Sequence, residues 1–166
     1  IIDKLTKIVS NLPSVEKVIV VPYENKSPKI ELIPNAIIFD DFIDAYEAIL
    51  IKFEQLPFNH PLYIMYSSGT TGVPKCIIHG AGGTLLKHIS EHLLHSDEKQ
   101  DDRIFYFTTC GWMMWNWLVS GLACGAALLL YDGSPFYPDG NILFDFADAE
   151  GMTHFGTSAK YIDALS

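Results

Sequence analysis

Small hydroxyl-bearing residues and glycines form the run Tyr66-Ser-Ser-Gly-Thr-Thr-Gly-Val-Pro-Lys75 between two apolar segments. Gly69 and Gly72 have no Cβ, so the backbone can approach a ligand closely and direct N–H groups at phosphate oxygens. Further donors are the hydroxyls of Ser67, Ser68, Thr70 and Thr71. Lys75 adds a positive charge at the exit of the run. This chemistry suits the phosphates of a nucleotide.

A plain turn is the simpler interpretation of a Ser/Gly/Thr cluster. The length of the run, its position between two β-type segments and the Pro74-Lys75 exit favour phosphate binding instead. The Walker A pattern of kinases and GTPases is absent, because Gly72 is followed by Val-Pro-Lys and then Cys76. Those two enzyme classes are therefore disfavoured.

Apolar periodicity predicts the elements that hold this loop. Leu62–Tyr66 and Cys76–His79 read as strands on either side of it. Elsewhere we expect helices over 1–12, 42–53, 85–93, 115–123 and 141–149, and strands over 18–21, 104–107, 127–131 and near 153. Alternating helices and strands predict a layered α/β fold with a mostly parallel sheet, flanking helices, and ligands at the carboxyl ends of the strands. We expect an α/β segment over 1–56 and a nucleotide-binding subdomain over 57–166.

Residues 67–75 match the hallmark of the adenylate-forming superfamily, which contains AMP-forming acyl-CoA synthetases, adenylation domains and luciferases. The neighbouring segments 60–66, 79–83, 109–117 and 131–135 resemble the members that activate acetoacetate. The resemblance implies part of the large N-terminal domain of an adenylate-forming ligase, truncated at its C-terminal end.

Enzymes of this superfamily join a carboxylate to AMP, release pyrophosphate and pass the acyl group to a thiol. The resemblance implies ATP, Mg²⁺, acetoacetate and coenzyme A as ligands. It assigns the β- and γ-phosphates to Ser67, Ser68, Gly69, Thr70, Thr71, Gly72 and Lys75, with Thr70 and Lys75 as catalytic residues. It assigns the acyl pocket to Trp112, Met113 and Met114, the coenzyme A arm to Phe136, and the approach to the acyl-adenylate to Thr157 or Ser158.

Two purely structural interpretations compete with these assignments. Aromatic and methionine side chains such as those of Trp112 to Trp117 are more often part of a core. Ser158 is equally a helix cap. The superfamily's Mg²⁺-binding Glu, its ribose-binding Asp and its C-terminal domain with the catalytic Lys have no counterpart here, so we expect a fragment that is inactive alone.

Two other local patterns suggest a zinc site and a membrane span. His88-Ile-Ser-Glu91-His92, followed by His95, fits an inverted zinc-protease motif, but helical spacing puts these histidines on a partly solvated flank. The uncharged stretch Trp112–Tyr131 has the length of a membrane span. We interpret Gly121 and Gly125 within it as points of close packing between a helix and the sheet. A non-catalytic nucleotide-binding or structural module is the remaining alternative.

Composition limits the possible partners. The formal charge of −9 argues against a nucleic-acid partner. Cys76, Cys110 and Cys124 form no close pair, which favours a reducing cytoplasm over a disulfide framework or a zinc knuckle. We therefore expect small-molecule substrates, no membrane partner, and a C-terminal domain of the same protein outside this chain.

Overall fold

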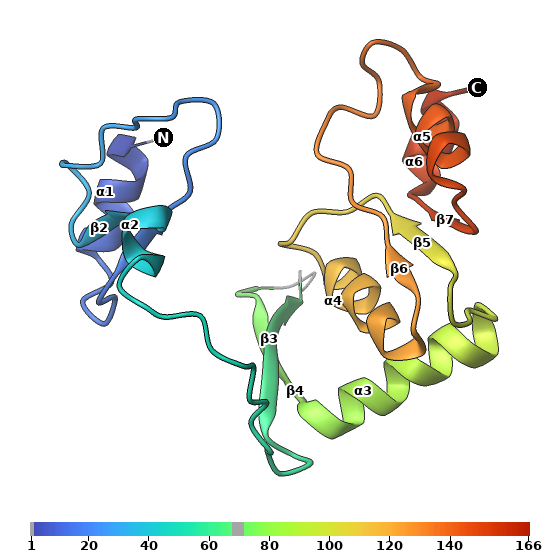
Figure 1. The fold of residues 1–166 in the computed structure, drawn as a ribbon, viewed down its shortest axis with the longest axis horizontal. Coiled ribbons are helices and arrows are strands. Elements are labelled where there is room, and N and C mark those ends of the chain that lie inside the picture. Colours follow the sequence, from blue (N-terminus) through green and yellow to red (C-terminus); the bar gives the residue numbers. More distant parts are fainter. Residues whose placement is uncertain (1, 68–71) are drawn as a thin grey trace. The chain divides into compact units, whose positions relative to one another are not determined.

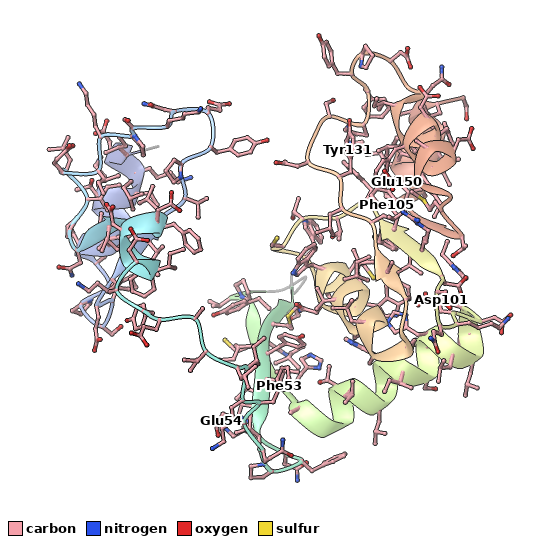
Figure 2. The ribbon with its side chains drawn as sticks, viewed as in Figure 1. Phe53, Glu54, Asp101, Phe105, Tyr131 and Glu150 are labelled. Atoms are coloured by element: carbon pink, nitrogen blue, oxygen red, sulfur yellow. The ribbon has the colours of Figure 1, made fainter. Side chains whose placement is uncertain are left out.

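A computed structural model of the chain describes residues 2–67 and 72–166. The chain divides into two compact units, Ile1–Phe53 and Glu54–Ser166. Phe53 and Glu54, on either side of this division, are labelled in Figure 2. Each unit is described by itself.

The first unit is small and contains two helices and two short strands. They are α1 (Ile2–Ser10), β1 (Val18–Val20), β2 (Ala36–Ile38) and α2 (Phe39–Ile43). β1 and β2 pair in parallel, with Val18 opposite Ala36. The first predicted helix and the first predicted strand are confirmed, and β2 is an additional strand.

The predicted helix over 42–53 is wrong for most of its length. α2 ends at Ile43, and residues 47–57 have no regular secondary structure. An amphipathic helix in a protein gains most of its stability by packing its apolar face against the rest of the fold. Here Tyr46 is 68% exposed and Ile49 is 84% exposed, so the pattern in the sequence is not accompanied by burial.

The second unit begins with a hairpin, β3 (Pro61–Ser67) and β4 (Lys75–Gly80), as the flanking apolar runs predict. Its strands are antiparallel. α3 (Ala81–Ser90) follows directly and continues into a π-helical turn, Glu91–His95. Figure 1 shows α3 leading away from the hairpin toward the region of α4 and β6.

A parallel sheet forms the rest of this unit. Its strands are β5 (Arg103–Tyr106), β6 (Ala127–Leu128) and β7 (His154–Gly156), in the order β6-β5-β7. The helices are α4 (Met113–Ser120), a 3₁₀ turn (Gly121–Cys124), α5 (Ile142–Glu150) and α6 (Ala159–Ala164). The α/β fold with flanking helices is as predicted, and the parallel sheets predominate over the one antiparallel hairpin among the described residues.

Helices cover the sheet on both faces. Successive residues of a strand point to opposite faces, so neighbouring residues of β5 contact different helices. Ile104 packs with Leu118 of α4, and the next residue, Phe105, packs with Leu143 of α5 and Tyr161 of α6. The chain therefore crosses from β5 to β6 over one face and from β6 to β7 over the other. This change of direction makes the carboxyl ends of β5 and β7 the expected place for a ligand.

The two glycines of the uncharged stretch have different roles. A Cβ on Gly121 would lie 2.3 Å from Cδ1 of Ile104, so the predicted close approach of helix and sheet is confirmed there. Gly125 instead ends the 3₁₀ turn in the left-handed conformation, with φ of +79°. Among the described residues, no helix combines the length and apolar character needed to cross a bilayer.

Candidate active site

The predicted phosphate loop joins the two strands of the hairpin. Ser67 ends β3 and lies opposite Lys75, the first residue of β4. Gly72 has φ of +145°, a conformation that favours glycine, and a Cβ there would meet nothing within 4 Å. Glycine is thus needed at this position for its backbone conformation. Ser68, Gly69, Thr70 and Thr71 lie outside the described residues, and their phosphate contacts stay predictions.

Lys75 is the only formally charged residue of the sequence between Pro61 and Gly80, although the whole chain carries −9. Its side chain is exposed, as is that of Val73 at 88%. The start of β4 is therefore a positively charged, accessible spot on an acidic chain. An anion would be attracted to this spot more than to its surroundings.

A cavity of about 320 Å³ lies between the end of β3 and the start of α4. It is lined by Ile64, Met65, Tyr66, Gly111, Trp112 and Met113. Tyr66 is the neighbour of Ser67, so the strand that carries the loop also lines this cavity. Asn116 Nδ2 lies 3.2 Å from the Met65 sulfur and joins α4 to β3. Two segments that the sequence assigned to phosphate and acyl binding are thereby adjacent. We call this space the acyl cavity.

The aromatic and methionine segment divides between cavity and core. Trp112 and Met113 are 70% and 52% exposed, so they are not core residues. Trp115 and Trp117 are partly buried and pack against the Ile104 cluster, as the core interpretation predicts. Met114 is half-buried and does not line the acyl cavity.

A second cavity, of about 420 Å³, lies at the carboxyl ends of β5 and β6. Apolar residues such as Phe105 and Tyr131, both labelled in Figure 2, line much of it. Thr108, Thr109 and Asp132 supply polar groups. These three were not singled out as site residues, although they follow the predicted strands directly and that position was a usable signal.

Two buried hydroxyls follow β7 in the chain, that of Thr157 directly after the strand and that of Tyr161 on α6. Thr157 Oγ1 and Tyr161 Oη have no hydrogen-bond partner among the described residues. Burial raises the pKa of Tyr161. Ser158 Oγ accepts a hydrogen bond from the Tyr161 N–H at 3.2 Å and so caps α6. Phe136 lies nearby, its ring centroid 5.5 Å from that of Tyr161. The hydroxyl of Thr157 thus lacks a hydrogen-bond partner among the described residues, whereas that of Ser158 is already engaged.

The histidines of the zinc-protease pattern make other contacts. His92 is fully buried, with Nδ1 2.6 Å from Glu98 Oε2, and His95 Nδ1 lies 2.9 Å from Glu91 Oε2. The expected solvation of His92 is wrong because α4 covers the ring, which stacks on Trp117 and lies 2.9 Å from Ser120 Oγ. The turn itself is π-helical, since the Ser96 N–H donates to the Glu91 carbonyl, five residues back. Within 2–67 and 72–166, no three His, Cys, Asp or Glu residues gather as a metal site would require.

His88 is the first histidine of the pattern. Its pKa is lowered, chiefly by burial and then by the nearby His92 and His79 rings, while Glu91 acts in the opposite direction.

Comparison with known proteins agrees with this geometry. The sequence matches the family described as AMP-binding enzymes over residues 2–165, and the chain belongs to that family. It is 60% identical over 148 residues to the acetoacetyl-coenzyme A synthetase of Rhizobium meliloti, which covers 89% of this chain and 23% of that protein. It is 51% identical over 170 residues to the acetoacetyl-CoA synthetase of Xenopus tropicalis, covering 99% of this chain and 25% of that protein.

A solved structure gives the same result. The acetoacetyl-CoA synthetase of Streptomyces lividans is 40% identical, with a TM-score of 0.83 over 98% of this chain and 24% of that one. The chain thus spans about a quarter of the length of these relatives. The family and the similar proteins do not favour the alternative of a non-catalytic module.

Proposed function

We propose that the polypeptide containing this chain activates acetoacetate with ATP and transfers the acyl group to coenzyme A. The carrying observation is the acyl cavity, which is lined by the strand that leads into the phosphate loop and by Trp112 and Met113. Similarity to acetoacetyl-CoA synthetases supports the choice of carboxylate.

In the first step a carboxylate oxygen of acetoacetate attacks the α-phosphorus of ATP. The bond from that phosphorus to the bridging oxygen breaks, and pyrophosphate leaves with the electron pair. Ser67, Gly72 and Lys75, together with the loop residues between them, bind the β- and γ-phosphates in this proposal. The Lys75 ammonium balances charge that builds on the leaving pyrophosphate.

In the second step the sulfur of coenzyme A attacks the acyl carbonyl carbon, the thiol loses its proton, and AMP leaves. We assign Trp112 and Met113, which line the acyl cavity, to the acyl side of this reaction, with Met114 next to them in the chain but outside the cavity lining. Phe136 contacts the coenzyme A arm. Thr157 supplies its unpartnered hydroxyl near the acyl-adenylate, with Ser158 beside it.

Mg²⁺ would accompany the triphosphate, and it prefers oxygen ligands, chiefly carboxylates and phosphate oxygens. The acyl cavity and the two hairpin residues Ser67 and Lys75 contain no carboxylate. These residues do not fit a Mg²⁺ site by themselves, and we assign the ion's protein ligands to other parts of the polypeptide.

The same proposal covers partners and location. We expect a C-terminal domain of the same protein to complete the site, and no nucleic-acid or membrane partner. Cys76, Cys110 and Cys124 are free thiols, which fits the reducing cytoplasm.

The test is ATP–pyrophosphate exchange by the full-length polypeptide with acetoacetate, and with acetate and 3-hydroxybutyrate for comparison. We expect exchange with acetoacetate, and a loss of about 10²-fold in Lys75→Met, the order found when one charge-stabilising contact is removed from a reaction site. Lys87→Met is the matched control, because Lys87 is an exposed lysine paired with Glu91 on α3. It should leave the rate unchanged.

Two results would count against the proposal. Equal losses in Lys75→Met and Lys87→Met would show that Lys75 has no special role. No exchange with any carboxylate by the wild-type full-length polypeptide would refute the ligase activity itself. This chain alone should show no exchange.

A further inference from the structure

A buried polar cluster joins the π-helical turn after α3 to the last turn of α4, and the proposed reaction uses none of its residues. It consists of His92 and Glu98, both with fully buried side chains, and of the Ser120 hydroxyl and the Trp117 carbonyl on α4. His92 Nε2 lies 2.9 Å from Ser120 Oγ and 3.0 Å from the Trp117 oxygen. We call these four groups the His92 cluster.

The hydrogen-bond donors and acceptors around His92 determine that its Nε2 carries a hydrogen. The Ser120 hydroxyl lies 2.6 Å from the Trp117 carbonyl, to which it donates. Nε2 of His92 therefore faces only acceptors and must carry a hydrogen. On the other side of the ring, Nδ1 lies 2.6 Å from the Glu98 carboxylate. That contact has the distance but not the angle of a good hydrogen bond, and we call it the His92–Glu98 contact.

Several further contacts hold the cluster in place. The His92 ring stacks on the Trp117 ring, with centroids 4.3 Å apart. The Glu98 N–H donates to the His92 carbonyl at 2.9 Å, so the segment after the π-helical turn folds back on it. Glu98 Oε1 has no partner among the described residues, but Glu98 lines a cavity of about 360 Å³ with room for water.

Stability alone is a poor reason for such a cluster. Two buried titratable side chains lose hydration, and an apolar pair of the same volume is often as stable or more stable. A π-helical turn is likewise uncommon and is frequent at functional sites. Both features therefore call for a role in geometry.

The cluster connects the two halves of the candidate site. α3 starts directly after β4, the second strand of the phosphate-loop hairpin, and its π-helical continuation carries His92. His92 contacts the last turn of α4, and the other end of α4 carries Met113 in the acyl cavity. Because α4 is only two turns long, a shift at its last turn moves its first turn too.

We propose that His92 and Glu98 are positioning residues, which fix α4 and thereby set the shape of the acyl cavity. Neither touches substrate. The kinetic part of this inference rests on the proposed function, whereas the placement of α4 does not.

The experiment compares four variants of the full-length polypeptide. His92→Gln keeps a donor toward α4 but leaves Glu98 without the His92 ring, and Glu98→Gln added to it replaces the His92–Glu98 contact by two amides. Ser120→Ala removes one of the two contacts on the α4 side and leaves the His92–Glu98 contact intact. His95→Gln is the matched control, because His95 lies on the same turn, is exposed and pairs with Glu91.

Two readouts are taken on each variant. In His92→Gln we expect the KM for acetoacetate to rise roughly tenfold or more while the KM for ATP stays within about twofold, since small misplacements at a reaction site have large effects. Hydrogen exchange of the α4 amides should become faster. The double variant should recover most of the loss, and His95→Gln should match the wild type.

The inference is overturned if folded His92→Gln keeps the wild-type KM for acetoacetate and wild-type exchange in α4. Equal changes in both KM values would also overturn it, because they would indicate an effect that is not confined to the acyl cavity. Should His92→Gln fail to fold, Ser120→Ala decides: faster α4 exchange supports the inference and unchanged exchange refutes it. Absence of activity in the wild type would refute the proposed function only, and the exchange data would still test the cluster.

Discussion

Burial distinguishes the three cysteine side chains of this chain. Cys76 and Cys110 are exposed, whereas Cys124 is partly buried. Burial raises the pKa of the Cys124 thiol, and the nearby Glu98 charge adds to this effect. The thiolate is the form that reacts with alkylating reagents, so a raised pKa leaves less of it at a given pH. We expect Cys124 to be the slowest of the three toward iodoacetamide at pH 8.

Mass spectrometry of peptides from the briefly alkylated native chain measures these rates. In concentrated urea the environment of Cys124 is lost, and the three rates should converge. A native rate at Cys124 equal to those at Cys76 and Cys110 would contradict the predicted effect of burial.

At this scale the sequence predicts residues whose chemistry is local. Lys75 is predicted because its neighbours in the chain define the loop that it belongs to. The burial of His92 could not be predicted that way, since its partners on α4 are 25 and 28 residues distant in sequence. The buried hydroxyl of Tyr161 was not predicted for a related reason, because its pattern is that of an ordinary core aromatic.

Among the elements, α4 and the 3₁₀ turn after it approach the sheet at Gly121. A Cβ at this position would lie 2.3 Å from Ile104, which is 1% exposed and has little room to move. We expect Gly121→Ala to lower the free energy of unfolding by about 1–3 kcal/mol, the usual cost of overpacking a core. Urea denaturation of the isolated chain, followed by circular dichroism, measures the change.

Gly83 provides the control within α3. A Cβ there would meet nothing within 4 Å. Gly83→Ala should therefore raise the free energy of unfolding by about 0.5–1 kcal/mol, because alanine favours the helix. Similar effects of the two substitutions would show that the Gly121 contact is not tight.

Elements were predictable where the local pattern is distinctive or agrees with burial. The hairpin strands are apolar, β-rich runs that flank a glycine-containing loop, and both were found although much of their apolar surface is exposed. The helix over 42–53 has the pattern without the burial, and it does not form. The order β6-β5-β7 depends on which strands pair across long connections, and no local pattern in one sequence specifies it.

For the whole molecule, charge and exposed apolar surface act in opposite directions. The hairpin exposes the cross-strand pair of Ile64 and Ile78, at 59% and 65%. A net charge of −9 at pH 7 keeps chains apart, but this repulsion disappears near the pI of about 4.9. Exposed apolar side chains on a strand then favour association. We expect light scattering by the isolated chain to rise steeply as the pH falls from 7 to 5.

The double variant Ile64→Thr/Ile78→Thr tests the origin of that association. Threonine keeps the β-branched shape and the net charge but replaces part of the apolar side chain by a hydroxyl. We expect clearly less scattering at pH 5 and no change at pH 7, where charge repulsion dominates. Thr84→Val on α3 is a useful opposite control, since it adds one apolar group away from the Ile64–Ile78 pair. If the double variant scatters as strongly as the wild type at pH 5, other apolar surface drives the association and the hairpin face does not.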